Sequence, residues 1–250
     1  GQVMRLRLFG GFTLLDRSQR EIRVPLKRAR ALLAYLALKS SHSDSRETLV
    51  DLLWPDRFKA QARASLRQVL FALNRLAPAS APLVTATRSE VALGPGLELC
   101  DVWAFEAVAG ADSVADAEEL LRIYAGPFLD EPELGVEPFQ QWAAIQRARR
   151  EGQLEDAVLR AADRHAEADA GARLETLLDR LIQRSPLCCQ AVLRLMELAA
   201  NEERPGDAIR CYERYANRLK LEFGDDPPAE LTDAWRTLKA APRLPARFAR

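Results

Sequence analysis

Residues 56–78, DRFKAQARASLRQVLFALNRLAP, restrict the fold of this chain more than any other stretch. Read at 3.6 residues per turn, the stretch predicts one helix whose apolar side chains share a face. That face consists of Ala62, Leu66, Val69, Leu70, Leu73 and Leu76. A helix of this kind must cover a core, so the segments around it have to supply one.

The opposite face of the same helix carries no acidic residue. It presents Arg67, Gln68, Phe71 and Arg75, with Arg63 and Asn74 at its edges. Arg, Gln and Asn can form paired hydrogen bonds with base edges in a major groove, so we expect a helix that contacts DNA. An ordinary surface helix with a solvated basic face is the alternative, and it carries about equal weight on the helix alone.

Charge is divided unevenly along the 250 residues, although 36 basic and 36 acidic side chains give no net charge. Residues 1–96 hold 16 basic and 7 acidic residues, a net +9. Residues 97–250 hold 20 basic and 29 acidic residues, a net −9. A basic N-terminal part joined to an acidic C-terminal part favours a nucleic-acid-binding domain followed by a domain with another task.

The segments around the helix predict a winged helix-turn-helix. Residues 3–25 alternate as a small antiparallel meander, 26–40 and 46–54 have helical spacing, and 83–96 form a hairpin around ATRSE. Arg88 falls at the hairpin tip, where a wing would meet the DNA backbone or minor groove; a free tip is an equal alternative. The predicted 26–40 helix begins with three cations, Lys27, Arg28 and Arg30. They form either a phosphate-binding cluster or a solvated one.

From residue 101 every strong pattern is helical. Helices separated by ADAG, RSP and ERPG indicate stacked helical hairpins. The segment GDAIRCYERYANRL has a small residue followed by aromatic residues, the pattern of a tetratricopeptide helix pair. We therefore expect a mainly α chain in which a winged helix-turn-helix, with its small β-sheet and wing hairpin, is followed by an all-α tetratricopeptide-like domain. The predicted domains are residues 1–98 and 99–241, with 242–250 as a basic tail or linker.

Enzymatic and cofactor-dependent functions find no support in the sequence. The four cysteines lack a CxxC spacing, which favours reduced structural thiols. Phosphate-binding GxxxxGK[ST] and GxGxxG motifs and the GxSxG nucleophile motif are missing, and the two histidines have no metal-ligand pattern. No apolar run of 18 residues occurs. We expect no enzyme, no cofactor, no metal, no small-molecule ligand and no membrane association.

Eight segments, spread from about Arg5 to about Leu238, carry a resemblance to a known family: LRLFGGFTL, LKRARALLAYLAL, RETLVDLLWPD and ARASLRQVLFALNRL, then YAGPFLDE, QWAAIQRAR, LIQRSPLCCQAVLRLMELA and AIRCYERYANRLKLEFGDDPPAEL. In these segments the chain resembles the SARP family of bacterial transcriptional regulators. In that family an OmpR-like winged helix precedes a bacterial transcriptional activation domain. The resemblance implies that the 59–76 helix enters the major groove, that the hairpin near Arg88 is the wing, and that two protomers bind direct repeats and contact RNA polymerase.

The expected function is that of a sequence-specific DNA-binding regulator, an activator, in the bacterial cytoplasm. Its expected partners are double-stranded DNA, RNA polymerase and a second protomer on DNA. The expected DNA contacts are Lys27, Arg28, Arg63, Arg67, Gln68, Asn74, Arg75 and Arg88. An interaction scaffold, or the regulatory part of a longer protein with weak or no DNA binding, is the alternative. Three roles remain possible for Phe71: contact with a thymine methyl group, contact with the wing, or contact with a partner protein.

Overall fold

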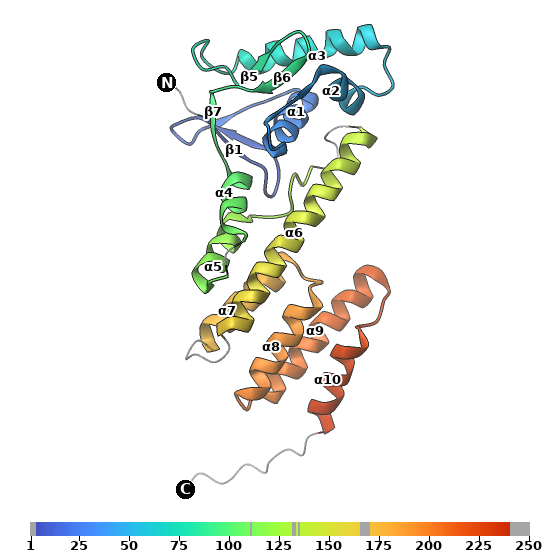
Figure 1. Cartoon of the computed structure of the whole chain (residues 1–250). Helices are drawn as coiled ribbons and strands as arrows, with labels where there is room; N and C mark the ends of the chain where they lie inside the picture. The colour runs from blue at the N-terminus through green and yellow to red at the C-terminus, as the bar shows by residue number, and fades with distance from the viewer. Residues whose placement is uncertain (1–3, 111, 132–133, 135, 166–170, 241–250) are drawn as a thin grey trace. The chain divides into compact units, whose positions relative to one another are not determined.

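The computed structural model describes residues 4–110, 112–131, 134, 136–165 and 171–240 (Figure 1). The chain forms two compact units. The first, here called the N-terminal unit, comprises Gly1–Gly110 and Arg122–Gln153; the second, the helical unit, comprises Ala111–Leu121 and Leu154–Arg250. The predicted tail 242–250 lies outside the described residues. The predicted mainly α class, with small N-terminal sheets followed by helices, is confirmed.

The first sheet of the N-terminal unit has the strand order β3-β2-β1-β7. Its strands are β1 (Met4–Arg7), β2 (Thr13–Leu15), β3 (Glu21–Ile22) and β7 (Leu97–Cys100). The meander β1-β2-β3 is antiparallel as predicted, and Met4, Leu6 and Leu8 are buried as the alternation requires. Strand β7, which pairs in parallel with β1, was not predicted.

Three helices form the core of this unit. They are α1 (Lys27–Leu38), α2 (Arg46–Leu53) and α3 (Lys59–Asn74), which pack on one another. Helix α2 starts where the Ser45 hydroxyl accepts a hydrogen bond from the main-chain N–H of Thr48, as expected of a serine cap. It ends at Leu53, and the next residue, Trp54, has a buried side chain and is followed by Pro55.

A second sheet, with the order β4-β6-β5, contains the predicted hairpin. Its strands are β4 (Ser43–Ser45), β5 (Val84–Ala86) and β6 (Glu90–Leu93), all paired antiparallel. The Thr87 hydroxyl closes the turn by accepting hydrogen bonds from the N–H groups of Ser89 and Glu90. The third strand, β4, lies between the two predicted helices 26–40 and 46–54, where the sequence patterns predicted no strand.

The half-buried carboxylate of Asp101 joins the start of α4 (Asp101–Val108) to the chain after β1. Both Asp101 oxygens accept from the N–H of Leu8, at 2.9 and 3.0 Å, and one also accepts from Phe9 at 3.0 Å. The Phe9 ring packs between Phe105 of α4 and Tyr124, which follows α5 (Val114–Ile123). The N-terminal unit therefore continues past the hairpin into the first helical segments.

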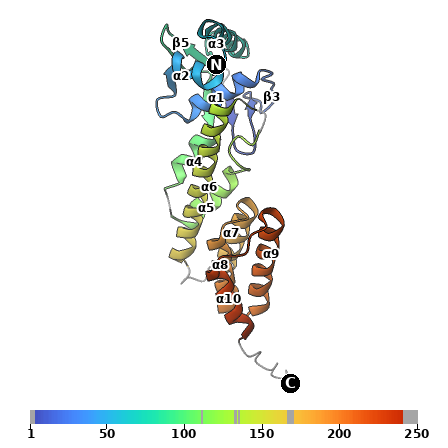
Figure 2. The same ribbon diagram turned by 90° about the vertical axis from the view of Figure 1, so that its right-hand side faces the viewer.

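The helical unit consists of antiparallel helices in sequence order. It holds the C-terminal part of α6 (Glu137–His165), followed by α7 (Gly171–Arg184), α8 (Cys189–Asn201), α9 (Pro205–Phe223) and α10 (Ala229–Ala240). Helices α7 to α10 lie side by side in both views (Figures 1 and 2). Their buried faces are built mainly from leucine, alanine and tyrosine. No helix in the described ranges combines the length and apolar character needed to cross a membrane.

Candidate nucleic-acid interface

The outward face of α3 matches the face predicted from the sequence. Leu66, Val69, Leu70 and Leu73 are buried, and Arg63, Arg67, Gln68, Phe71 and Arg75 are exposed. Leu76, predicted on the inner side, lies just beyond the end of the helix and is half-buried. Helix α3 contains no acidic residue along its whole length. It therefore presents to solvent a cationic, hydrogen-bonding surface about 16 residues long.

Side chains on this face differ in whether they already have hydrogen-bond or ion-pair partners within the chain. Arg63 lies 3.7 Å from Glu47 of α2, with both side chains more than half exposed, so the pair is weak and readily exchanged for another anion. Arg67 and Gln68 have no hydrogen-bond or ion-pair partner within the described residues. Arg67 and Gln68 are therefore available to an external partner without breaking any internal contact.

Asn74 has a different task from the one that the sequence suggested. Its amide nitrogen donates to the carbonyl of Val84 at 2.9 Å, and its amide oxygen accepts from the Val84 N–H at 3.1 Å. An asparagine has one amide group, and here both ends of it bind the first residue of β5. We therefore remove Asn74 from the predicted DNA contacts; it joins α3 to the hairpin.

The hairpin turn is held against α2 by Arg46, a residue that the sequence patterns did not single out. The Arg46 guanidinium donates to the carbonyl of Thr87 at 2.8 Å, and its main-chain N–H donates to Ser89 at 2.8 Å. Arg88 lies between these two anchor points and is exposed. The hairpin is thus fixed at both its base and its turn, with the Arg88 side chain projecting from the turn.

A second basic cluster forms at the start of α1. Arg28 is half-buried, and burial together with the nearby Arg57 guanidinium lowers the pKa of Arg28 below its ordinary value. The Nε atom of Arg28 is buried without a hydrogen-bond partner in the described part of the chain. Two like charges in this position would be relieved by a bound anion. Sequence reasoning missed Arg57 because it lies in a loop, 29 positions from Arg28.

The other two cations at the start of α1 behave differently. Arg30 forms an ion pair with Glu131 at 2.9 Å, so its charge is neutralised within the unit. Lys27 is exposed and takes part in an interaction of its own. The basic cluster near the start of α1 therefore consists of Lys27, Arg28 and Arg57. Arg30 does not belong to it, because Glu131 already neutralises its charge.

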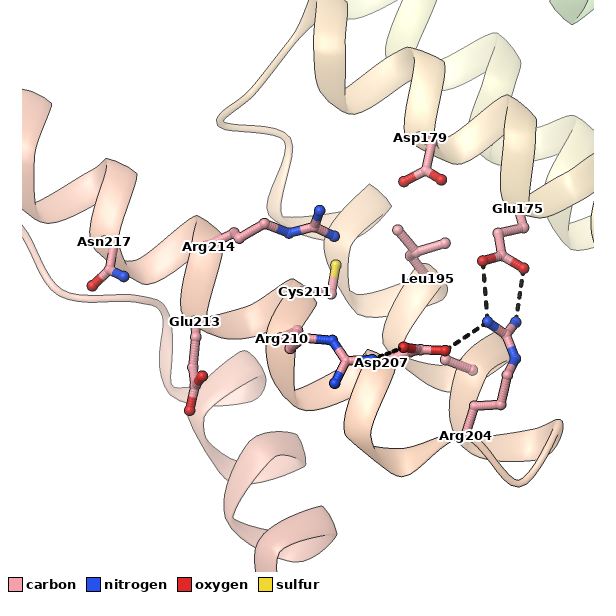
Figure 3. A pocket seen from close by; sticks show the side chains of 11 residues that line it. Glu175, Asp179, Leu195, Arg204, Asp207, Arg210, Cys211, Glu213, Arg214 and Asn217 are labelled. Atoms are coloured by element: carbon pink, nitrogen blue, oxygen red, sulfur yellow. Dashed lines mark hydrogen bonds and ion pairs between the residues drawn. The ribbon is translucent and has the colours of Figure 1, made fainter.

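The helical unit contains a separate polar pocket of about 460 Å³ between α7, α8 and α9 (Figure 3). On one side Arg204 binds Glu175 at 2.7 Å and Asp207 at 2.9 Å, and Asp207 also binds Arg210. Cys211 points into the pocket, and burial raises the pKa of its thiol to about 11. The thiol is therefore protonated at neutral pH, and the paired charges mainly tie the helices together.

No group of three or more His, Cys, Asp or Glu side chains is placed to hold a metal ion in the described ranges. The four cysteines are free thiols, and three of them are buried.

Comparison with known proteins gives a matching family model and similar solved structures. The bacterial transcriptional activator domain model matches residues 100–239. The chain also resembles Mycobacterium tuberculosis EmbR, solved in complex with a low-affinity phosphopeptide, with a TM-score of 0.67 and 17% sequence identity. The likeness covers 96% of this chain and 65% of the EmbR chain, so this chain spans about two thirds of that protein. No curated protein sequence matches.

The EmbR likeness, at 17% identity, supports the fold, including the part of the N-terminal unit before residue 100, which the family model does not reach. The family model covers more than half of the 250 residues. The chain belongs to the bacterial transcriptional activator domain family.

Proposed function

We propose that this protein is a SARP-type transcriptional regulator, a sequence-specific DNA-binding activator that reads its site with the outer face of α3. The observation that carries the proposal is the pair Arg67 and Gln68, which are exposed in the middle of a helix that has no acidic residue. Neither side chain has a hydrogen-bond or ion-pair partner among the described residues. Arginine binds guanine and glutamine binds adenine through paired hydrogen bonds in the major groove. Arg75, about two turns further along, extends the same surface.

The remaining cations fit phosphate contacts. Arg88 at the hairpin turn would meet the backbone or minor groove beside the groove that α3 occupies, because Asn74 fixes the hairpin to α3. Lys27 and Arg28, together with Arg57, form the cluster at the start of α1 where an anion would relieve the repulsion between Arg28 and Arg57. Arg63, weakly paired with Glu47, extends the basic surface towards the start of α3. Phosphate contacts of this kind set position and orientation, and base contacts specify sequence.

The helical unit is proposed to serve protein contacts. The SARP resemblance implies that two protomers bind direct repeats and that the activator recruits RNA polymerase in the bacterial cytoplasm, at the nucleoid. The division of charge supports this assignment, because residues 97–250 carry a net −9 and would be repelled by DNA. We assign DNA binding to about residues 1–98 and activation to about 99–241. In this proposal the protein binds its partners and catalyses no reaction.

Selection from a pool of random double-stranded DNA tests the proposal and supplies the binding site. The protein is mixed with the pool at low salt, retained fragments are amplified, and the cycle is repeated until a sequence is enriched. Enrichment of one motif, present as two copies in the same direction, is the expected result. Retention without enrichment would contradict sequence-specific reading. No retention even at low salt would contradict DNA binding and favour an interaction scaffold.

A further inference from the structure

Phe71 is an apolar side chain at the centre of the cationic face of α3. It is 67% exposed, and it lies one helical turn after Arg67 and one turn before Arg75. A single exposed apolar residue on a protein surface is common and needs no explanation. This one, however, occupies the middle of the surface that the proposed function assigns to base reading.

Neither the core nor the hairpin covers this ring. Asn74 holds β5 at the C-terminal end of α3 through Val84, and Phe71 keeps its exposure with the hairpin in that position. The Phe71 ring therefore makes no wing contact that could account for it.

Arg75 lies beside the exposed ring. Its guanidinium carbon is 5.9 Å from the centroid of the Phe71 ring, within the range of a cation–π contact. The contact restricts the long Arg75 side chain to the outer face. The apolar ring of Phe71 and the hydrogen-bond donors of the Arg75 guanidinium thus project together from adjacent turns.

We infer that Phe71 contacts the 5-methyl group of a thymine in the major groove, while Arg75 binds next to it. A phenyl ring gains nothing from phosphate oxygens, and thymine is the base that presents an apolar group in that groove. DNA is favoured as the occupant by charge, since Arg63 and Arg67 precede Phe71 on the exposed face of α3, Arg75 follows it, and the helix contains no acidic residue. The inference rests on the proposed function and adds the base that this residue selects.

Replacing thymine by deoxyuridine removes the methyl group and keeps base pairing. Fragments enriched by the selection are synthesised with deoxyuridine at each thymine in turn, and the Kd of each is measured for the wild-type protein, Phe71→Ala and Phe71→Leu. For the wild type, deoxyuridine at one or more thymine positions in each repeat is expected to raise the Kd about fourfold. This factor corresponds to about 0.8 kcal/mol, the free energy of burying one carbon, since a tenfold change in Kd is about 1.4 kcal/mol.

Phe71→Ala is expected to bind thymine and deoxyuridine equally at that position, and Phe71→Leu is expected to keep part of the difference. Circular dichroism checks that both variants fold, which their exposed position favours. The inference is wrong if no thymine responds, or if the response persists in Phe71→Ala. It is also wrong if Phe71→Ala lowers only the cooperativity between two protomers, because the residue would then face protein. Failure of the wild type to retain any DNA would instead overturn the proposed function, and the inference with it.

Discussion

Asn74, the last residue of α3, binds Val84, the first residue of β5, through both ends of its amide group, at 2.9 and 3.1 Å. One side chain thus replaces a main-chain pairing partner at the edge of the hairpin. The proposed reading helix and the proposed wing are joined at this point as a single rigid surface.

Asn74→Ala removes both hydrogen bonds and leaves the Val84 N–H and carbonyl without their partner. We expect the free energy of unfolding to fall by about 1–3 kcal/mol. We also expect weaker DNA binding, because the hairpin is no longer fixed relative to α3. Urea denaturation gives the first quantity and titration with a selected fragment gives the second. Asn74→Asp keeps one acceptor and loses the donor, so its stability should lie between those of Asn74→Ala and the wild type. Full wild-type stability in both variants would contradict this assignment.

Asp101 should contribute to stability through the main chain that it holds. Asp101→Ala leaves the buried N–H groups of Leu8 and Phe9 without an acceptor, and we expect a loss of about 2–3 kcal/mol in the free energy of unfolding. Asp101→Asn retains one acceptor and should lose less. Chemical denaturation of both variants at pH 7 measures the difference. A loss below about 0.5 kcal/mol for alanine would show that water replaces the carboxylate there.

The pH dependence of the N-terminal unit should include a contribution from Asp44. Burial would raise the pKa of this carboxyl, but hydrogen bonds from Tyr35, the Ser45 N–H and Lys39 outweigh it and lower the pKa. Because the folded-state pKa lies below the unfolded value of about 4, the contribution is complete above pH 4 and is lost as pH falls further.

Tyr35→Phe removes the hydroxyl donor, which donates to Asp44 at 2.7 Å. The variant should be less stable than the wild type by about 1 kcal/mol at pH 7, and the gap should narrow as pH falls below about 4. Carbon-detected NMR titration of Asp44 should show a higher midpoint in the variant. A gap that is constant from pH 7 to pH 3 would mean that the hydroxyl stabilises the fold through packing.

Among the four cysteines, Cys189 should react first with a disulfide reagent. It is half-buried, whereas Cys100, Cys188 and Cys211 are at most 7% exposed. Burial also raises the pKa of the Cys188 and Cys211 thiols to about 11, so few thiolates form at pH 8. We expect one fast thiol in the native protein and four after unfolding. Cys189→Ser should abolish the fast phase; a fast phase that survives in that variant would contradict the burial pattern.

The sequence predicted those features that depend on local periodicity. The inner and outer faces of α3, the meander of β1 to β3 and the hairpin around Arg88 follow from residues close together in the chain. Strand β4 was missed because Ser43–Ser45 has no apolar alternation and forms a strand only by pairing with β6. Strand β7 was missed because its partner β1 lies more than 90 positions away.

The candidate site shows the same division. Arg67, Gln68 and Arg75 could be selected from a helical wheel, because exposure on an amphipathic helix follows from spacing. The roles of Asn74, Arg46 and Arg57 could not, since each depends on a contact with a different element. A helical wheel places Asn74 at the edge of the outer face, and only the hairpin shows that its amide is already bound.

The most direct test of the account compares two double variants of equal charge. Arg67→Ala with Arg75→Ala alters the outer face of α3, and Arg218→Ala with Arg236→Ala removes two exposed arginines from the helical unit, where each has only a surface ion pair. Affinity for a selected fragment is measured by fluorescence anisotropy over a series of salt concentrations. We expect the first variant to bind at least about 30-fold more weakly, as for the loss of two arginine contacts worth about 1–3 kcal/mol each, and to show a shallower salt dependence. The second variant should bind like the wild type. Equal affinity of the α3 variant and the wild type would show that this helix does not read DNA.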